Sequence, residues 1–75
     1  MRKKYKNPKE LATCLKDLVD LSLDGIMTFE KAQGKVQAIA EANKETVFNE
    51  GKVSYKIATV LGEERTEELN RMLEI

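Results

Sequence analysis

Carboxylates at helical spacing are the residues of this chain that could most readily carry out chemistry. The sequence has no histidine, so no Ser–His or Cys–His pair can form, and acid–base catalysis would need paired acids. Spacings of three and four residues bring such acids onto one helix face, and the candidates are Asp17, Asp20, Asp24, Glu41 and Glu45. Because 75 residues leave little room for a concave pocket, we interpret these acids as solvated faces. We predict no catalytic residue and no enzyme activity.

Metal and thiol chemistry have equally little support in the sequence. One cysteine, Cys14, and no histidine leave a zinc site without its common ligands. The densest acidic group follows no calcium-loop pattern and fits a helix N-terminus instead; it comprises Glu63, Glu64, Glu67 and Glu68. We therefore predict no metal and no cofactor. Cys14 falls on an apolar helical stripe, which indicates a buried structural thiol.

A basic arm at the start of the chain is the candidate for contact with nucleic acid. Its cations could bind phosphate and its aromatic ring could stack on a base, and the residues are Arg2, Lys3, Lys4, Tyr5 and Lys6. The whole chain carries 13 basic and 13 acidic residues, so its net charge is zero. A neutral chain is not a general polyanion binder. We expect a solubilising tail and keep nucleic acid contact as the alternative.

Helices must position these residues, because the apolar residues recur at intervals of three and four. Asn7 and Pro8 predict the start of a helix over about residues 8–23, which ends before the turn signal Asp24-Gly25. Thr28 can cap the next helix. Ile26 or Met27 could pack against the first turns of that helix as a hydrophobic staple. A capping signature at Thr66 predicts a short C-terminal helix over about 65–74.

The length of the second helix is the main open question. Asn49-Glu50-Gly51 could form a turn, and Gly51 costs about 1 kcal/mol relative to alanine inside a helix. The apolar spacing nevertheless keeps its phase from Val47 to Leu61. We therefore predict one helix over about residues 28–61, which would be roughly 50 Å long at 1.5 Å per residue. Gly62 then fits the C-terminal cap.

A helix of that length predicts a partner subunit, because a helix over residues 8–23 can cover only part of it. The uncovered stripe is a possible oligomer interface made of Val47, Gly51, Ser54, Ala58 and Leu61. Asn43 interrupts the stripe and could fix register between subunits. The expected fold is an all-α helical hairpin with a short C-terminal helix, completed as a bundle by homo-oligomerisation, most simply as a dimer. It forms one domain, residues 1–75, with a flexible arm over 1–6 and a helical body over 7–75.

Localisation follows from what surrounds the basic arm. No apolar run approaches the ~20 residues that a membrane helix needs. Residues 6–10 are polar where a signal peptide needs an apolar stretch. A single unpaired cysteine suits a reducing compartment. We expect a cytoplasmic protein that does not enter a membrane.

Several short motifs occur in a fixed order between residues 15 and 62. They are Asp24-Gly25, Thr28, Lys31-Ala32, the small residues within 38–42, Lys52-Val53, Tyr55 and Gly62. In this pattern the stretch resembles a group of small phage and prophage proteins of about this length. The resemblance implies a bacterial host cytoplasm and a continuous second helix, and it implies no mechanism. The chain departs from the pattern at Gly51, where alanine is expected, and in its longer C-terminal helix.

These observations predict a non-enzymatic phage or prophage accessory protein that acts by binding. We expect a homo-oligomer that engages an unidentified protein of the host or the phage. The alternative is a small DNA- or RNA-binding regulator that uses the basic arm. A small ligand held between subunits is a third possibility, but the sequence has no glycine-rich phosphate loop to support it.

Overall fold

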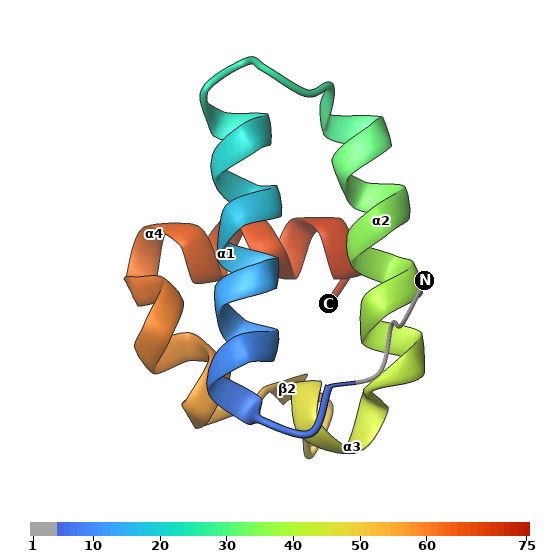
Figure 1. Cartoon of the computed structure of the whole chain (residues 1–75), viewed down its shortest axis with the longest axis vertical. Coiled ribbons are helices and arrows are strands. Elements are labelled where there is room, and N and C mark those ends of the chain that lie inside the picture. Colours follow the sequence, from blue (N-terminus) through green and yellow to red (C-terminus); the bar gives the residue numbers. More distant parts are fainter. Residues whose placement is uncertain (1–4) are drawn as a thin grey trace.

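Four helices and one two-stranded antiparallel sheet make up the fold of this computed structural model, which describes residues 5–75 (Figure 1). In chain order the elements are α1 (Pro8–Leu23), α2 (Phe29–Ala42), α3 (Lys44–Val47), β1 (Phe48–Asn49), β2 (Lys52–Val53) and α4 (Tyr55–Leu73). The helical content confirms the all-α class, to which the sheet is a minor addition.

The ends of α1 confirm the bounds that the sequence predicts. The Asn7 side chain caps the helix, since its Oδ1 accepts a hydrogen bond of 2.8 Å from the Lys9 backbone N–H. Pro8 occupies the first turn, where a missing N–H costs nothing. The helix ends at Leu23, and Gly25 follows with a φ of 75° that L-residues rarely adopt. The start and end of α1 therefore follow from local signals.

The predicted continuous helix over residues 28–61 is wrong. Thr28 does cap α2, with its Oγ1 accepting from the Lys31 N–H at 3.2 Å, but α2 ends at Ala42. Asn43 leaves helical geometry with φ −128° and ψ 35°. Its side-chain Nδ2 donates to the Ile39 carbonyl at 2.8 Å, which gives the backbone an alternative to the helix.

A β-hairpin replaces the expected middle of that helix. The register pairs Phe48 with Val53 and Asn49 with Lys52, so Glu50 and Gly51 form a two-residue connection. Both connecting residues have positive φ, 54° and 79°, which is the backbone that the tightest hairpin turns require. The regular spacing of apolar residues from Val47 to Leu61 favoured one helix, but it continues across this chain reversal only by coincidence.

Gly62 divides α4 into two helical segments. Its φ of 84° and ψ of 170° lie far from helical values, and the ribbon changes direction there (Figure 1). The sequence correctly places a helix end at Gly62, and the C-terminal segment follows it directly, a little before the predicted start at residue 65. The second segment then crosses α1 and α2.

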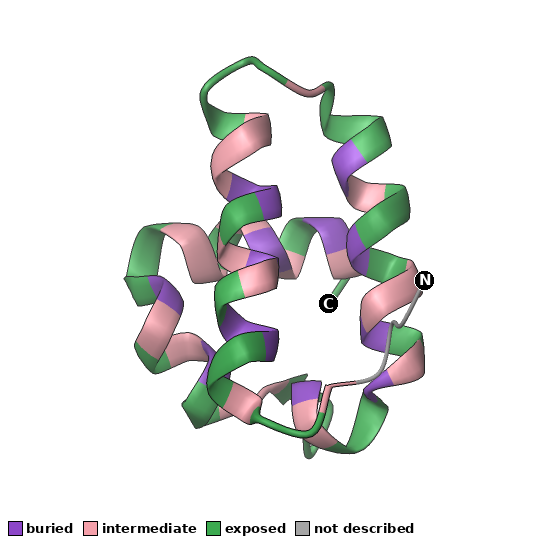
Figure 2. Cartoon of the chain, in the orientation of Figure 1, coloured by how far each residue is buried: buried purple, intermediate pink, exposed green. Residues whose placement is uncertain are grey.

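The core lies where α1, α2 and α4 meet, and Figure 2 shows buried positions on the inward faces of these helices. Gln33 and Gln37 of α2 both donate to the Met72 carbonyl, at 3.1 and 3.0 Å, and so fasten the end of α4. The buried apolar residues are Leu11, Ala12, Leu15, Leu18, Val19, Ala32, Val36, Ala40, Val47, Ile57, Leu61, Leu69 and Met72.

The residues predicted as an oligomer interface do not form one stripe. Val47 and Leu61 are buried in the core of their own chain, while Gly51 is exposed in the hairpin. Ser54 and Ala58 are half-buried near the start of α4. The helix whose surplus length required a partner is absent, so that length no longer supports a partner subunit.

Candidate functional site

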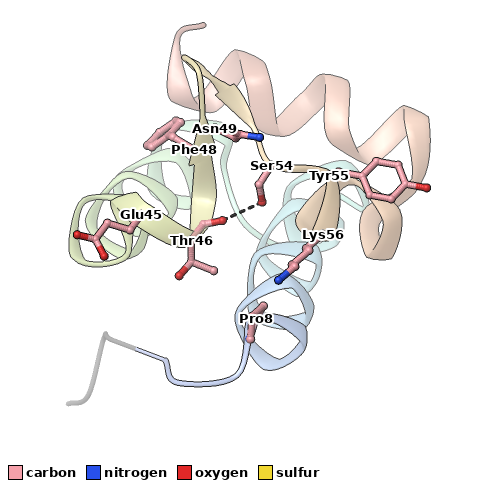
Figure 3. A pocket seen from close by; sticks show the side chains of 8 residues that line it. All are labelled: Pro8, Glu45, Thr46, Phe48, Asn49, Ser54, Tyr55 and Lys56. Carbon is pink, nitrogen blue, oxygen red and sulfur yellow. Dashed lines mark hydrogen bonds between the residues drawn. The ribbon is translucent and has the colours of Figure 1, made fainter.

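A groove lies where the start of α1, α3, the hairpin and the start of α4 meet (Figure 3). It consists of two adjoining hollows of about 420 and 350 Å³, which share Pro8, Tyr55 and Lys56. We call it the Tyr55 groove, and its lining residues are Asn7, Pro8, Lys9, Glu45, Thr46, Phe48, Asn49, Ser54, Tyr55, Lys56, Thr59 and Val60.

Contacts across the chain reversal fix the groove in place. The Ser54 N–H donates to the Val47 carbonyl at 2.7 Å. The Ser54 hydroxyl donates to the Thr46 carbonyl at 2.8 Å, the bond drawn in Figure 3. These two bonds hold the first turn of α4 against α3, so the position of Tyr55 is set by its backbone. Its side chain is nevertheless 82% exposed.

The groove combines an apolar surface with two cations. Pro8 and Val60 supply aliphatic carbon, and Phe48 lines the far side with its ring turned away from Pro8; both Phe48 and Val60 also pack against the core. The Tyr55 ring projects outward at one side. Lys56 extends toward Pro8 in Figure 3, and Lys9 lines the adjoining hollow. Glu45 is the acidic residue of this lining. Such a surface suits an apolar side chain that has an acidic neighbour, and it holds no nucleophile beside a base.

The arm predicted to contact nucleic acid is described only in part. Arg2, Lys3 and Lys4 lie outside the described residues. Tyr5 is half-buried, and its hydroxyl donates to the Cys14 Sγ at 3.3 Å, a bond that raises the pKa of the tyrosine. Lys6 is exposed. The structure thus places the Tyr5 ring against the body of the protein instead of extending it toward solvent.

Asn43 binds Tyr5, one of the arm residues that the sequence analysis treated as free. Its side chain is buried, with 4% exposed, and its Oδ1 accepts from the Tyr5 N–H at 2.9 Å. The sequence did single out Asn43 as a polar residue on an apolar stripe, but assigned it to register between subunits. Cys14, predicted as buried, is half-buried, and it receives the Tyr5 hydroxyl.

The acids that could have formed a catalytic pair take part in ion pairs or face solvent. Asp20 accepts from Arg65 Nε at 2.6 Å and from Lys16 Nζ at 3.1 Å. The hydrogen bond from Arg65 does most to hold the pKa of Asp20 below its ordinary value. Glu41 pairs with Lys44 at 2.9 Å. The remaining candidates are exposed; they are Asp17, Asp24 and Glu45.

A second surface feature lies at the opposite end of the molecule. Leu23, Ile26 and Phe29 are exposed around the α1–α2 turn, Ile26 by 74%. Of the two residues proposed as a staple, Met27 packs against the core and Ile26 does not. We call Leu23, Ile26 and Phe29 the apolar tip. Three large apolar residues around Asp24-Gly25 are the sequence signal that could have revealed it.

Sequence reasoning also missed the Tyr55 groove. Tyr55 and Lys56 were assigned to the middle of a long helix, where neither would mark a site. The signal present in the sequence was Ser54, a residue that often precedes a helix, directly before an aromatic residue. No three Cys, Asp or Glu side chains of residues 5–75 gather where they could bind a metal ion.

Comparison with known proteins gives one match. A family model described as "Conserved hypothetical protein" matches residues 2–74, so it includes both the groove and the apolar tip. No curated protein and no solved structure matches the chain. Over the described residues, none of the helices has both the length and the apolar character needed to cross a membrane.

Proposed function

Since the chain belongs to this family of conserved hypothetical proteins, whose description names no activity, we propose its function from its surface: a non-enzymatic module that binds a protein segment in the Tyr55 groove. The observation that carries the proposal is the 82% exposure of a tyrosine on a backbone fixed by two hydrogen bonds from Ser54. An aromatic ring that is exposed on a fixed backbone beside an apolar hollow can serve as an anchor for a partner.

The chemistry of the groove indicates the kind of segment it would accept. Pro8, Phe48 and Val60 can cover an apolar side chain, and Lys9 and Lys56 can pair with acidic residues beside it. We therefore propose an exposed turn or extended segment that combines large apolar residues with Asp or Glu. The absence of histidine from the sequence and the ion pairs of Asp20 and Glu41 support a role without catalysis.

A selection from random short peptides tests this proposal. We expect peptides that pair a large apolar residue with acidic ones to be enriched on the wild-type protein. Their binding should weaken at least tenfold with Tyr55→Ser or Lys56→Glu and persist with Tyr55→Phe, which keeps the ring. Glu67→Lys, an exposed charge reversal elsewhere on α4, is the control. If the selected peptides bind the Tyr55→Ser variant as tightly as the wild type, the groove is not the site.

Nucleic acid binding is the second candidate, because Lys9, Lys56 and Tyr55 gather in the groove at the end of the molecule where the basic arm joins α1. Cations beside an exposed aromatic ring suit a single strand. The net charge of zero makes this weaker than a protein partner. A mobility shift with single-stranded DNA or RNA at about 50 mM salt, lost when residues 1–6 are deleted, would favour it. No shift at that salt concentration rejects it.

The phage or prophage origin and the homo-oligomeric state are also proposals. The resemblance over residues 15–62 supports the origin, and neighbouring genes for replication, packaging or host defence would test it. For the oligomer, the apolar tip takes the place of the long helix as the supporting observation. Light scattering during size-exclusion chromatography would test this state, for which a mass of 8.5 kDa at every concentration would be contrary evidence.

A further inference from the structure

The apolar tip is exposed although hydrogen bonds fix the backbone of its turn. The Leu21 carbonyl accepts hydrogen bonds from both the Ile26 and Met27 N–H groups, each at 3.0 Å. Thr28 then caps α2 directly after them. The backbone of this turn is therefore fixed, and it holds Ile26 74% exposed beside Leu23 and Phe29. Exposed large apolar residues grouped around a fixed turn are typical of interaction surfaces.

The charges around the tip are opposite to those of the Tyr55 groove. Asp24 and Glu30 flank the three apolar side chains and are exposed. Lys31 is the nearest cation along the chain, and Arg65, which also interacts electrostatically with Asp24, is paired with Asp20. The groove has the reverse balance, two lysines, Lys9 and Lys56, against one acid, Glu45. The tip thus has the composition that the groove would accept, large apolar residues with acids beside them.

Because tip and groove match in polarity and in charge, we propose that the apolar tip of one copy of this chain occupies the Tyr55 groove of a second copy. This inference rests on the proposed function of the groove and names its occupant. The two surfaces lie at opposite ends of α1, which at 1.5 Å per residue are about 24 Å apart (Figure 1). A chain cannot fill its own groove with its own rigid turn at that separation, so the occupant must come from another copy.

The contact is head-to-tail. It therefore differs from a symmetric dimer, in which one patch meets itself. A tip against a tip would bring Asp24 and Glu30 next to the same acids of the second copy, and a groove against a groove would oppose Lys9 and Lys56 in the same way. Head-to-tail contacts propagate, and they end in an open chain or close into a ring. The contact involves few residues, so we expect association that is weak and depends on concentration.

Two single substitutions separate this arrangement from a tip-to-tip and from a groove-to-groove dimer. Ile26→Glu spoils the tip and leaves the groove intact, whereas Lys56→Glu spoils the groove and leaves the tip intact. Both residues are exposed, so neither change disturbs the core, and circular dichroism checks the fold. Sedimentation equilibrium from about 10 µM to 1 mM should show wild-type mass rising above 8.5 kDa and each variant at least tenfold weaker in self-association.

The mixture of the two variants is the decisive measurement. An equal mixture retains one intact tip and one intact groove, so it should form a species of two chains and nothing larger. Ile26→Leu should assemble as the wild type does, and raising the salt from about 50 to 500 mM should weaken assembly because the charges are exposed. A symmetric tip-to-tip dimer would instead let Lys56→Glu assemble alone.

Three results would overturn the inference: a wild-type protein that stays monomeric at 1 mM, a Lys56→Glu variant that assembles like the wild type, or a mixture that forms no pair. The proposed function is judged separately by the peptide selection. A monomeric wild type that binds selected peptides in the groove removes this inference alone. A protein that neither assembles nor binds any peptide removes both.

Discussion

The α1–α2 turn and the segment over residues 43–54 both reverse the chain, but they are held by different means. In the turn the hydrogen bonds are local, such as those from the Ile26 and Met27 N–H groups to the Leu21 carbonyl. The segment has a local bond of the same kind, from the Ser54 hydroxyl to the Thr46 carbonyl, and in addition a distant partner, since the Asn43 Oδ1 accepts from the Tyr5 N–H. The first reversal leaves apolar side chains outside, and the second buries Val47.

This difference explains how a chain of 75 residues forms two distinct surfaces, the apolar tip and the Tyr55 groove. In the α1–α2 turn the backbone hydrogen bonds are local and Met27 makes the contact with the core, so Ile26 can face solvent on a fixed backbone. A reversal fixed from a distance must bring several elements together, and the hollow between them is the Tyr55 groove. The two surfaces proposed to bind each other therefore arise from two opposite ways of reversing the chain.

The largest effect should come from removing the remote anchor of the segment. Asn43→Ala leaves the Tyr5 N–H and the Ile39 carbonyl without their side-chain partner, next to a buried position. We expect the free energy of unfolding to fall by about 1–3 kcal/mol, the penalty for leaving buried polar groups unsatisfied. Denaturant unfolding measures it. Asn49→Ala, an exposed change in β1, should stay within about 0.5 kcal/mol, and equal effects for the two would contradict a special role for Asn43.

Gly25 and Gly51 test a feature that both reversals share, a glycine with positive φ. Gly25 and Gly51 both have positive φ, 75° and 79°, and a Cβ at either would meet no atom within 4 Å. Replacing each with alanine should therefore lower the free energy of unfolding by about 1 kcal/mol through backbone strain alone. Gly34→Ala is the matched control, because Gly34 lies inside α2 with equally open space.

That control should have the opposite sign. Alanine in a helix interior is more stable than glycine, so Gly34→Ala should raise the free energy of unfolding by about 0.5–1 kcal/mol. The same result at Gly51 would indicate a continuous helix through residue 51, and the hairpin would then be wrong. Thermal or denaturant unfolding of the three variants side by side decides between the two.

The same contrast explains what the sequence could predict. Asn7, Asp24-Gly25 and Thr28 act on residues within a few positions, and each correctly marked a helix boundary. Asn43 ends α2 with help from Tyr5, which lies 38 residues away, and no periodicity contains that contact. The 3-4 spacing from Val47 to Leu61 continues by coincidence, since both end residues are buried in the core but a hairpin reverses the chain between them.

The candidate site was less accessible to prediction than the fold. Tyr55 becomes a surface feature only because α4 begins at that residue, and the start depends on how Ser54 meets Thr46 and Val47. With a long helix assumed, an aromatic residue at that position carries no information about a groove. The apolar tip, in contrast, lies in a turn that the sequence placed correctly, and its exposure could have been inferred from Ile26 next to Asp24-Gly25.

The smallest effect on stability that we expect comes from a long-range ion pair near the α1–α2 turn, between Asp20 and Arg65. The pKa of Asp20 is lowered chiefly by the Arg65 hydrogen bond, so the folded value lies below the unfolded value of about 4. The pair therefore contributes fully above the unfolded pKa, and its contribution is lost as pH falls through the folded value. Since the two side chains are 28% and 40% exposed, solvent screening keeps this contribution small.

Asp20→Asn isolates that contribution. The wild type should be slightly more stable than the variant at pH 7, and the difference should vanish as the pH is lowered past the folded pKa of Asp20. Urea unfolding in steps from pH 7 to about pH 2 measures it. Asp17→Asn, an exposed acid on the same helix, should show no such trend. A loss at pH 7 as large as that of Asn43→Ala would mean that the turn, too, depends on a distant partner, and the contrast between the two reversals would fail.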